Sequence, residues 1–215
     1  MAFYINLTKH PERAKGMGLS MSVGSSTPPE PPTPKYVHYW DNDGEHLESF
    51  TDNKIPTGYY SGRTDIYKVL IEQGVTLSDS AFRNCTNLSS ITTNQTTLVA
   101  SSFRGCTSLV EANLNRVYFM EGWVFSGCTS LTSVTLPDTI ISIGGWAFGG
   151  CTNLEEVTVL NRQEDGVSLG NGVFAGCSKL DSITSYADGF DCNRGNPFSN
   201  EIGRASCRER VCLSV

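Results

Sequence analysis

The sequence predicts a repeat solenoid, mainly of β structure, in which short parallel strands stack in about five coils plus a partial sixth. Three observations support this prediction. The motif F-x-x-C-x-x-L occurs five times, apolar residues alternate beside each copy, and turn-forming residues separate the alternating segments. Successive copies are 21, 22, 23 and 26 residues apart. A period in this range is the sequence signature of stacked coils.

Each copy of the motif places three apolar side chains at fixed offsets. A single coil cannot bury them, so neighbouring coils must stack and share one continuous core. The phenylalanines are Phe82, Phe103, Phe125, Phe148 and Phe174. The cysteines three residues later are Cys85, Cys106, Cys128, Cys151 and Cys177. We expect these ten residues to form a structural ladder along the stack.

Two short strands are expected in each coil. Val134 and Leu136 alternate around Thr135, which is the two-residue period of a strand with one buried face. A second alternation lies seven and five residues before each Phe, as at Ile141 and Ile143. Pro-Asp and Gly-Gly pairs between these segments predict the turns that join the two strands.

The stretch from Leu131 to Leu154, LTSVTLPDTIISIGGWAFGGCTNL, resembles the BspA-like class of leucine-rich repeats. The unit of that class reads L-x-x-V-x-L-P-x-x-I-x-x-I-G-x-x-A-F-x-G-C-x-x-L. The resemblance covers residues 66–200 and implies a curved, right-handed coil like that of leucine-rich repeats, with a parallel sheet on its concave side. The family occurs in surface proteins of bacteria, protists and phages that bind other macromolecules. The resemblance therefore implies a protein or glycan partner.

Composition and charge exclude several classes of function. The chain has 22 acidic and 16 basic residues, a net charge of −6, and no Lys/Arg cluster, so we expect no nucleic-acid partner. It has no run of about 20 apolar residues that would span a membrane, and its first residues lack the apolar segment of a signal peptide. All three histidines lie outside the repeats. We therefore expect no enzyme activity, no cofactor and no metal.

The repeat cysteines have two interpretations. One is a metal cluster or redox relay, and the other is a column of buried structural thiols. One cysteine per coil places neighbouring thiols about one strand spacing, ~4.8 Å, apart. Zinc sites use C-x-x-C pairs, which the repeats lack. A small apolar side chain whose S–H approaches a carbonyl is therefore the favoured interpretation.

A polar column is expected on the outer face of the longer strands, because side chains there alternate with the buried ones. Its middle positions are Thr92, Asn113, Thr135, Thr158 and Thr184, and Glu111 and Glu156 are among the residues that flank them. Threonine is favoured on exposed strands for its packing alone, and we favour this explanation. The alternative is a surface that binds polar groups of a partner.

A pair of tryptophans forms a second candidate binding surface. Trp123 and Trp146 lie two residues before Phe in adjacent coils, where the other coils have Ser80, Ser101 and Gly172. A position that accepts Ser and Gly is not expected deep in the core. The two rings would then form either an aromatic shelf for a sugar or a protein side chain, or a pair that packs together to cover the coil edge. The sequence leaves both open.

The ends of the chain differ from the repeats. Residues 1–24 form a separate tail, interpreted as an attachment segment, and residues 25–35 a Pro-rich linker. Residues 36–65 are rich in aromatics and are expected to cap the first coil. Phe198 begins the partial sixth coil, but residues 201–215 depart from the repeat and resemble a translated cloning or sequencing adapter, so they are interpreted as a non-native tail. An open last coil predicts self-association through that end.

Two functional hypotheses follow. The first is a non-enzymatic recognition or adhesion module that displays the repeat surface to a protein or glycan. The alternative is a structural component or receptor-binding spacer of a phage virion, a phage tail or a surface assembly. Both place the protein on a cell surface or a virion.

Overall fold

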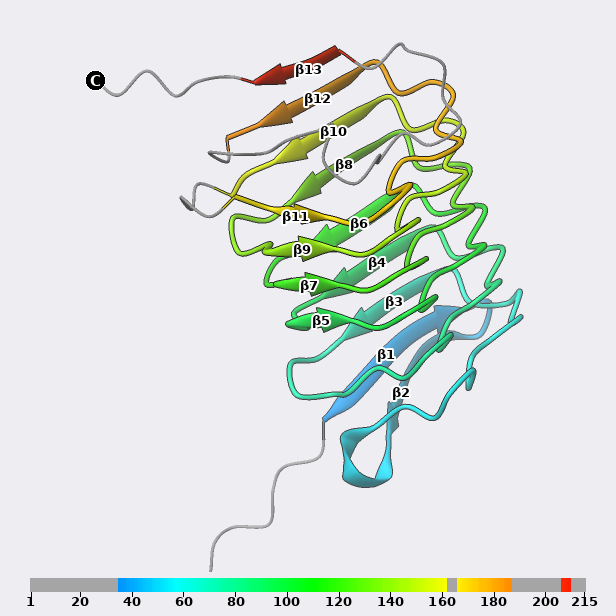
Figure 1. Ribbon diagram of the computed structural model, residues 1–215. Coiled ribbons are helices and arrows are strands. Elements are labelled where there is room, and N and C mark those ends of the chain that lie inside the picture. Colours follow the sequence, from blue (N-terminus) through cyan, green and yellow to red (C-terminus); the bar gives the residue numbers. More distant parts are fainter. Residues whose placement is uncertain (1–34, 162–165, 187–205, 210–215) are drawn as a thin grey trace, which may run out of the picture. The chain divides into compact units, whose positions relative to one another are not determined.

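The computed structural model describes residues 35–161 and 166–186 and the backbone of residues 206–209. All of them belong to one compact unit, Pro34–Val215. This unit is a β-solenoid of about five turns with short parallel strands (Figure 1), so the predicted fold class is confirmed. Predictions for residues 1–24, for most of the linker and for Phe198 lie outside the described residues.

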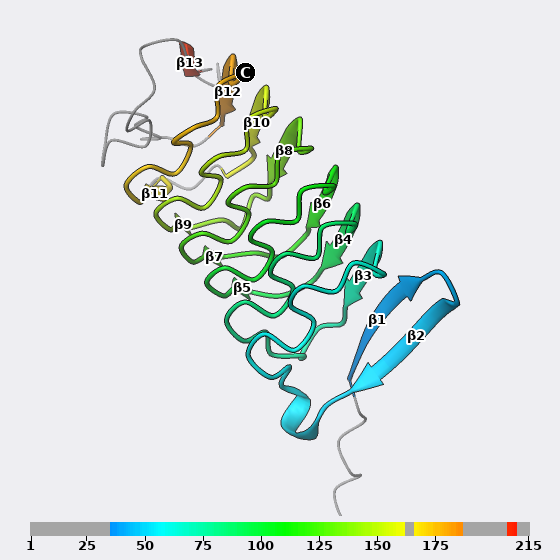
Figure 2. The same ribbon diagram turned by 90° about the vertical axis from the view of Figure 1, so that its right-hand side faces the viewer.

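The longer strands, one per coil, lie on one side of the solenoid (Figure 2). They are β3 (Lys68–Ile71), β4 (Ser90–Thr93), β6 (Glu111–Leu114), β8 (Ser133–Leu136), β10 (Glu156–Val159), β12 (Ser182–Ser185) and β13 (Ser206–Glu209). Neighbouring strands pair in parallel with equivalent repeat positions aligned, so that Thr158 lies opposite both Thr135 and Thr184. This register follows from the buried alternate residues, because a shift of one position would turn them toward water.

The ladder of long strands is broken once. The strands β3, β4 and β6 belong to one sheet, and β8, β10, β12 and β13 belong to another. Figures 1 and 2 both show β6 and β8 farther apart than the strands on either side of them. The coils are nevertheless continuous behind this break, where the Phe103 amide donates to the Val124 carbonyl at 3.0 Å.

Two-residue strands form a second parallel sheet. They are β5 (Thr97–Leu98), β7 (Phe119–Met120), β9 (Ser142–Ile143) and β11 (Ser168–Leu169). Ile143 points inward as expected, but Ile141 is exposed and Ile140 is buried instead. The expected alternation is wrong here because the chain is still turning, with the Ile140 amide donating to the Pro137 carbonyl at 3.2 Å.

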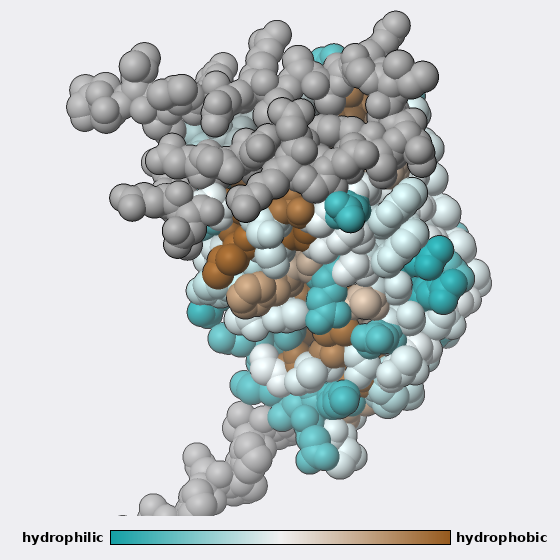
Figure 3. All heavy atoms as spheres, in the orientation of Figure 1, coloured by the Kyte–Doolittle hydropathy of each residue, from teal (hydrophilic) through white to brown (hydrophobic). Residues whose placement is uncertain are grey.

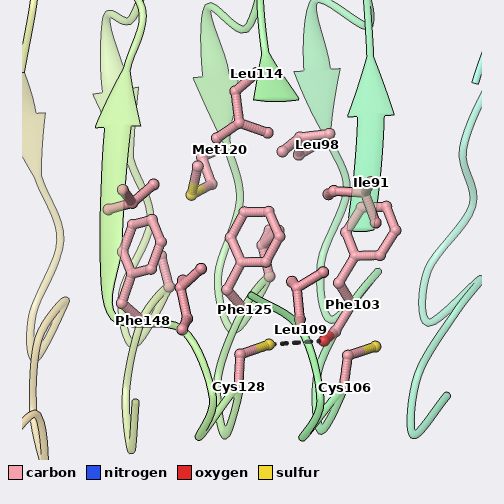
Figure 4. Close-up of a cluster of buried hydrophobic side chains, with 14 of the residues drawn as sticks. Ile91, Leu98, Phe103, Cys106, Leu109, Leu114, Met120, Phe125, Cys128 and Phe148 are labelled. Atoms are coloured by element: carbon pink, nitrogen blue, oxygen red, sulfur yellow. Dashed lines mark hydrogen bonds between the residues drawn. The ribbon is translucent and has the colours of Figure 1, made fainter. Parts of the chain in front are cut away.

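The five repeat phenylalanines form one buried stack through the solenoid. Each is fully buried, and successive rings are nearly parallel, with centroid separations of 5.5, 5.6, 5.5 and 5.7 Å. Figure 4 shows Phe103, Phe125 and Phe148 side by side among buried aliphatic side chains. Offset aromatic pairs of this kind contribute about 0.5–1.5 kcal/mol each beyond the burial of their area.

Tyr60 adds an aromatic ring below this stack. Its ring lies 4.6 Å from that of Phe82 at an angle of 6°, and it is fully buried. Tyr60 precedes Phe82 by 22 residues, one repeat step. Its hydroxyl donates to Glu48 at 2.7 Å, and burial together with this carboxylate raises the pKa of the phenol. The stack therefore begins earlier than residue 66, where the repeats were expected to start.

The repeat cysteines form a second buried column. All five are free thiols. Each donates its S–H to the carbonyl oxygen of the aromatic ladder residue one coil earlier, at 3.1–3.3 Å. Figure 4 shows one such bond, from Cys128 to Phe103. A buried carbonyl at each coil corner thereby gains a partner.

An antiparallel hairpin precedes the first coil. It consists of β1 (Tyr36–Asp41) and β2 (Gly44–Ser49), followed by the short 3-10 helix η2 (Thr51–Asn53). β1 pairs antiparallel with β3, with Val37 opposite Ile71. The hairpin thus covers the sheet edge that the first long strand would otherwise expose.

The backbone of residues 206–209 forms β13, which pairs in parallel with β12. Ser206 lies opposite Ser182, so the strand falls at the position that the repeat step would assign to the next coil. The interpretation of residues 201–215 as a non-native tail, and self-association through this end, stay predictions.

Candidate functional site

The predicted polar column lies on the outer face of the long strands. Asn113 and Thr135 are exposed, and Thr92, Thr158 and Thr184 are half-buried. Glu111 and Glu156 are exposed beside them. The Glu111 carboxylate accepts hydrogen bonds from Asn113 at 3.0 Å and from Ser90 at 3.2 Å. The break between β6 and β8 divides this column between Asn113 and Thr135, so it is not one continuous surface. Its role in binding stays a prediction.

The two tryptophans lie side by side at the coil edge. Their ring centroids are 5.0 Å apart and the planes differ by 8°. Trp123 is 37% exposed, and Trp146 is half-buried. The rings therefore pack on each other, as expected for a pair that covers the coil edge. Both rings also reach solvent, which an aromatic shelf for a partner requires.

Two further residues hold the tryptophan pair. The Arg104 guanidinium lies over the Trp123 ring, 4.8 Å from its centroid. Trp146 packs so closely against Gly149 that a Cβ at Gly149 would lie 2.6 Å from the indole. Arg104 and Trp146 both pack on the Trp123 ring, whereas the coil after Trp146 has Gly172 in the same column, which offers no ring. The Arg104–Trp123–Trp146 group is thus a cation and two stacked rings at the surface.

The backbone explains why this column accepts such different residues. All five residues of the column have a positive φ, between 58° and 64°: Ser80, Ser101, Trp123, Trp146 and Gly172. Glycine adopts this left-handed conformation without strain, and other residues adopt it at a cost. The column thus combines a left-handed turn with partial exposure, because all of its residues except Gly172 are exposed or half-buried.

A cleft of about 790 Å³ opens where β6 and β8 separate. It is lined by Ala112, Asn113, Leu114, Asn115, Thr135, Pro137, Asp138 and Leu160. Within the described residues, the side chains of Asn115, Thr135 and Asp138 form no hydrogen bond or ion pair. Asn113 and Thr135 were expected to lie on a binding face, but sequence reasoning missed the cleft and the other residues around it. The available signals were Ala112, where the other coils have Ile or Val, and Pro137 at the end of β8.

Apolar side chains are also exposed on the short-strand sheet. Phe119 in β7 is 46% exposed, and Ile141 just before β9 is 37% exposed. Figure 3 shows apolar residues gathered on this face of the molecule.

Titratable groups cluster in the N-terminal hairpin. His38 contacts Glu45 at 3.0 Å and Glu72 at 3.2 Å, while His46 contacts Asp41 at 2.8 Å. In the part of the chain that the structure describes, no group of three or more His, Cys, Asp or Glu residues could hold a metal ion. Nor does that part contain a helix long and apolar enough to span a membrane.

Comparison with protein families identifies the repeats. Residues 96–200 match six copies of the BspA type leucine rich repeat region. The repeats belong to the BspA-type leucine-rich repeat family. The match begins later than the predicted start at residue 66, although the stack of aromatic rings in this chain already includes Tyr60 and Phe82. A comparison with curated protein sequences found no match.

Comparison with solved structures finds several that resemble this chain. A leucine-rich repeat protein from Bacteroides ovatus is 25% identical, with a TM-score of 0.62 over 73% of this chain and 40% of that one. The pneumococcal vaccine antigen PcpA is 18% identical, with a TM-score of 0.53 over 71% of this chain and 38% of that one. A leucine rich cell surface protein from Faecalibacterium prausnitzii is 20% identical, with a TM-score of 0.45 over 72% of this chain and 54% of that one. The chain spans about two fifths of the B. ovatus protein.

Proposed function

We propose that the protein is a non-enzymatic recognition module that binds a protein or glycan on a cell surface through side chains displayed by its coils. The observation that supports this proposal best is the group of Arg104, Trp123 and Trp146, a cation and two stacked rings at the surface of a rigid repeat scaffold. Tryptophan and arginine are enriched among the residues that contribute most of the binding energy at protein interfaces, and the flat face of a sugar packs well on an indole.

Several features make this group suitable for recognition rather than catalysis. It contains no acid, base or nucleophile arranged for proton transfer or covalent chemistry. The buried aromatic stack beneath it fixes the coils, so little conformational entropy is lost when a partner binds. No observation in the described ranges favours the alternative role in a virion or surface assembly.

The test is to change the tryptophans to the residue that other coils use. Trp123→Ser, Trp146→Ser and the double variant keep a residue type that already occurs with positive φ at Ser80 and Ser101. We expect the double variant to lose binding to glycan arrays and to panels of cell-surface proteins by about tenfold or more. Tyr67→Ser, which removes an exposed aromatic outside the pair, is the matched control.

Stability must be measured separately from binding. If urea unfolding of the double variant is close to that of the wild type and binding is lost, the aromatic group is the recognition surface. Binding that is unchanged in all three tryptophan variants would remove it from that role and leave the pair as a packing feature of the coil edge.

A further inference from the structure

The break between β6 and β8 leaves backbone groups facing the cleft. On the β6 side, the Glu111 amide donates to the Ser89 carbonyl at 3.2 Å, so the groups of Glu111 and Asn113 point toward β4. Backbone groups of successive strand residues point to opposite edges. The N–H and C=O groups of Ala112 and Leu114 therefore point toward β8, where the described chain provides no ladder partner.

The β8 side has the complementary arrangement. The carbonyls of Thr132 and Leu136 accept hydrogen bonds from the next coil, the latter from Leu160 at 3.0 Å. By the same alternation, the backbone groups of Ser133 and Thr135 point toward β6. Three of the four residues with such groups, Ala112, Leu114 and Thr135, line the cleft itself.

Two residues at the break differ from their equivalents in the following coils. In the next two coils, Leu160 and Tyr186 occupy the position equivalent to Pro137. Their backbone amides donate to the Leu136 and Val159 carbonyls of the preceding coil, both at 3.0 Å. Proline has no N–H and cannot make this bond. Ala112 also fills less of the core than the Ile or Val of the other coils, which leaves space where β6 and β8 would pack together.

The cleft offers side-chain contacts as well as backbone ones. Asn115, Thr135 and Asp138 supply an amide, a hydroxyl and a carboxylate without partners among the described residues, while Pro137 and Leu160 supply an apolar wall. Two strand edges that present N–H and C=O groups in alternation match an extended polypeptide backbone, and pockets beside them select its alternate side chains. Sugar hydroxyls have no such repeat. The Asp138 carboxylate favours a basic side chain on the peptide.

We propose that the cleft between β6 and β8 binds an extended polypeptide segment, whose backbone pairs with Ala112 and Leu114 or with Ser133 and Thr135. The segment carries an apolar side chain toward Leu160 and a Lys or Arg toward Asp138. This inference rests on the proposed recognition role, but it uses a site separate from the tryptophan pair.

Hydrogen exchange tests the open edges directly. In the full chain without peptide, NMR should show faster amide exchange at Ala112, Leu114, Ser133 and Thr135. The amides of Asn113 and Val134 lie in the same strands but face paired neighbours, so they are the controls. Their exchange rates should be at most about one tenth of those of the four open amides. Equal protection of both sets would overturn the proposal.

The occupant is tested with peptides selected from a random seven-residue display library on the full chain. Synthetic copies of the selected peptides should slow the amide exchange of either Ala112 and Leu114 or Ser133 and Thr135. N-methylation of the peptide at alternate residues should weaken its binding by about tenfold or more. The double variant Ala112→Ile with Pro137→Leu takes its residues from equivalent positions, Ile91 and Leu160, and should abolish peptide binding. Asp138→Asn is a second variant, at an exposed residue, and should weaken peptides that carry Lys or Arg.

Three outcomes would contradict the proposal: no selected peptide, binding that survives both N-methylation and closure of the cleft, or protection of the four amides by an array glycan instead. The result is independent of the tryptophan pair, because Trp123→Ser with Trp146→Ser should retain peptide binding. If the peptide still protects the cleft amides in that variant and binding to glycan arrays and cell-surface proteins is unchanged, the proposed function of the tryptophans is overturned. The cleft site is then still supported.

Discussion

The buried thiols illustrate what a single residue contributes to a repeat. Cys85, Cys106 and Cys128 each donate to a carbonyl one coil earlier, and all are buried. Burial raises the pKa of Cys85 to about 11 and raises the pKa of Cys106 and Cys128 further. A thiol with a raised pKa is a poor nucleophile, because the thiolate is the reactive form.

We therefore predict that the five repeat cysteines resist alkylation in the folded protein. Iodoacetamide at about pH 8 should leave them unmodified, because neither the thiolate nor the access it needs is present. Peptide mapping by mass spectrometry gives the modification of each cysteine. Alkylation in guanidinium provides the control, where all five should react. Rapid modification of Cys106 or Cys128 in the native state would contradict the buried column.

Single residues were predicted with different success. The positions of Phe and Cys follow from the motif because one repeated environment selects one residue type. Tyr60 was missed because Arg63 and Ile66 stand where the motif requires Cys and Leu, so only the 22-residue step and the aromatic ring remain as signals. The exposure of Trp123 was expected, but the positive φ of its column and the Arg104 contact depend on backbone geometry that residue type does not specify.

Neighbouring coils approach so closely after β9 and β11 that only glycine fits. A Cβ at Gly170 would lie 2.4 Å from the Gly145 nitrogen and 2.8 Å from the Gly144 carbonyl carbon. The Gly170 amide also donates to the Ile143 carbonyl at 2.8 Å. Both neighbours are backbone atoms, which cannot move without shifting a coil.

We predict that Gly170→Ala lowers the free energy of unfolding by about 1–3 kcal/mol through this overpacking. The change in the urea midpoint at constant slope measures it. Ser168→Ala, at an exposed position of β11, is the control and should change stability little. A Gly170→Ala variant as stable as the wild type would mean that the coils can separate here at no cost.

The N-terminal hairpin is attached to β3 partly through His38. Burial lowers the pKa of His38, but hydrogen bonds to Glu45 and Glu72 raise it more, so its pKa in the folded protein exceeds 6.5. Its stabilisation is fully present below 6.5 and is lost as the pH rises through the raised value. A backbone hydrogen bond from Tyr36 and the His38 contact lower the pKa of Glu72 below 4.5, so the Glu72 contribution is lost only in acid.

We predict that His38→Gln destabilises the hairpin at about pH 5.5 and has little effect at about pH 9, where the wild-type histidine is neutral. Hydrogen exchange of the β1 amides at the two pH values measures this difference. An equal effect of the substitution at both values would show that His38 acts through packing and not through its charge.

The division of the long-strand sheet could not be predicted from the repeat. The motif aligns β6 with β8 as well as it aligns β4 with β6. Ala112 and Pro137 differ from their equivalents in the following coils, but the family pattern itself contains proline at that position. Whether a ladder closes is settled by packing between coils, which a one-dimensional pattern does not contain.

In the whole molecule, the aromatic stack crosses the break in the long-strand ladder, beside the short-strand ladder, which is continuous there through β7 and β9. The rings of Phe103 and Phe125 are 5.6 Å apart across the break, and the Cys128 thiol bonds to the Phe103 carbonyl at 3.3 Å. Stability in a stacked-repeat protein is nearly a sum of terms for each repeat and each interface. The interface at the break lacks the long-strand part of its ladder, so the core contacts supply a larger share of the coupling there, together with the β7–β9 pairing.

We predict that Phe125→Ala costs about 3–5 kcal/mol and also separates unfolding into two transitions, one for the coils on each side of the break. Hydrogen exchange followed by mass spectrometry across a urea series would resolve them. Phe148→Ala is the matched control, because β10 in its coil is paired on both sides. It should lose similar stability in one transition. A single transition in Phe125→Ala would mean that the halves remain coupled without this ring.

The thiol column has one more consequence, for how such a chain changes in length. In each bond the hydrogen comes from one coil and the oxygen from the coil before it, so every internal unit brings one of each. A tandem duplication of one unit therefore adds a matched donor and acceptor, and neither is left without a hydrogen-bond partner. The scaffold can be extended or shortened by whole units while its interior stays satisfied.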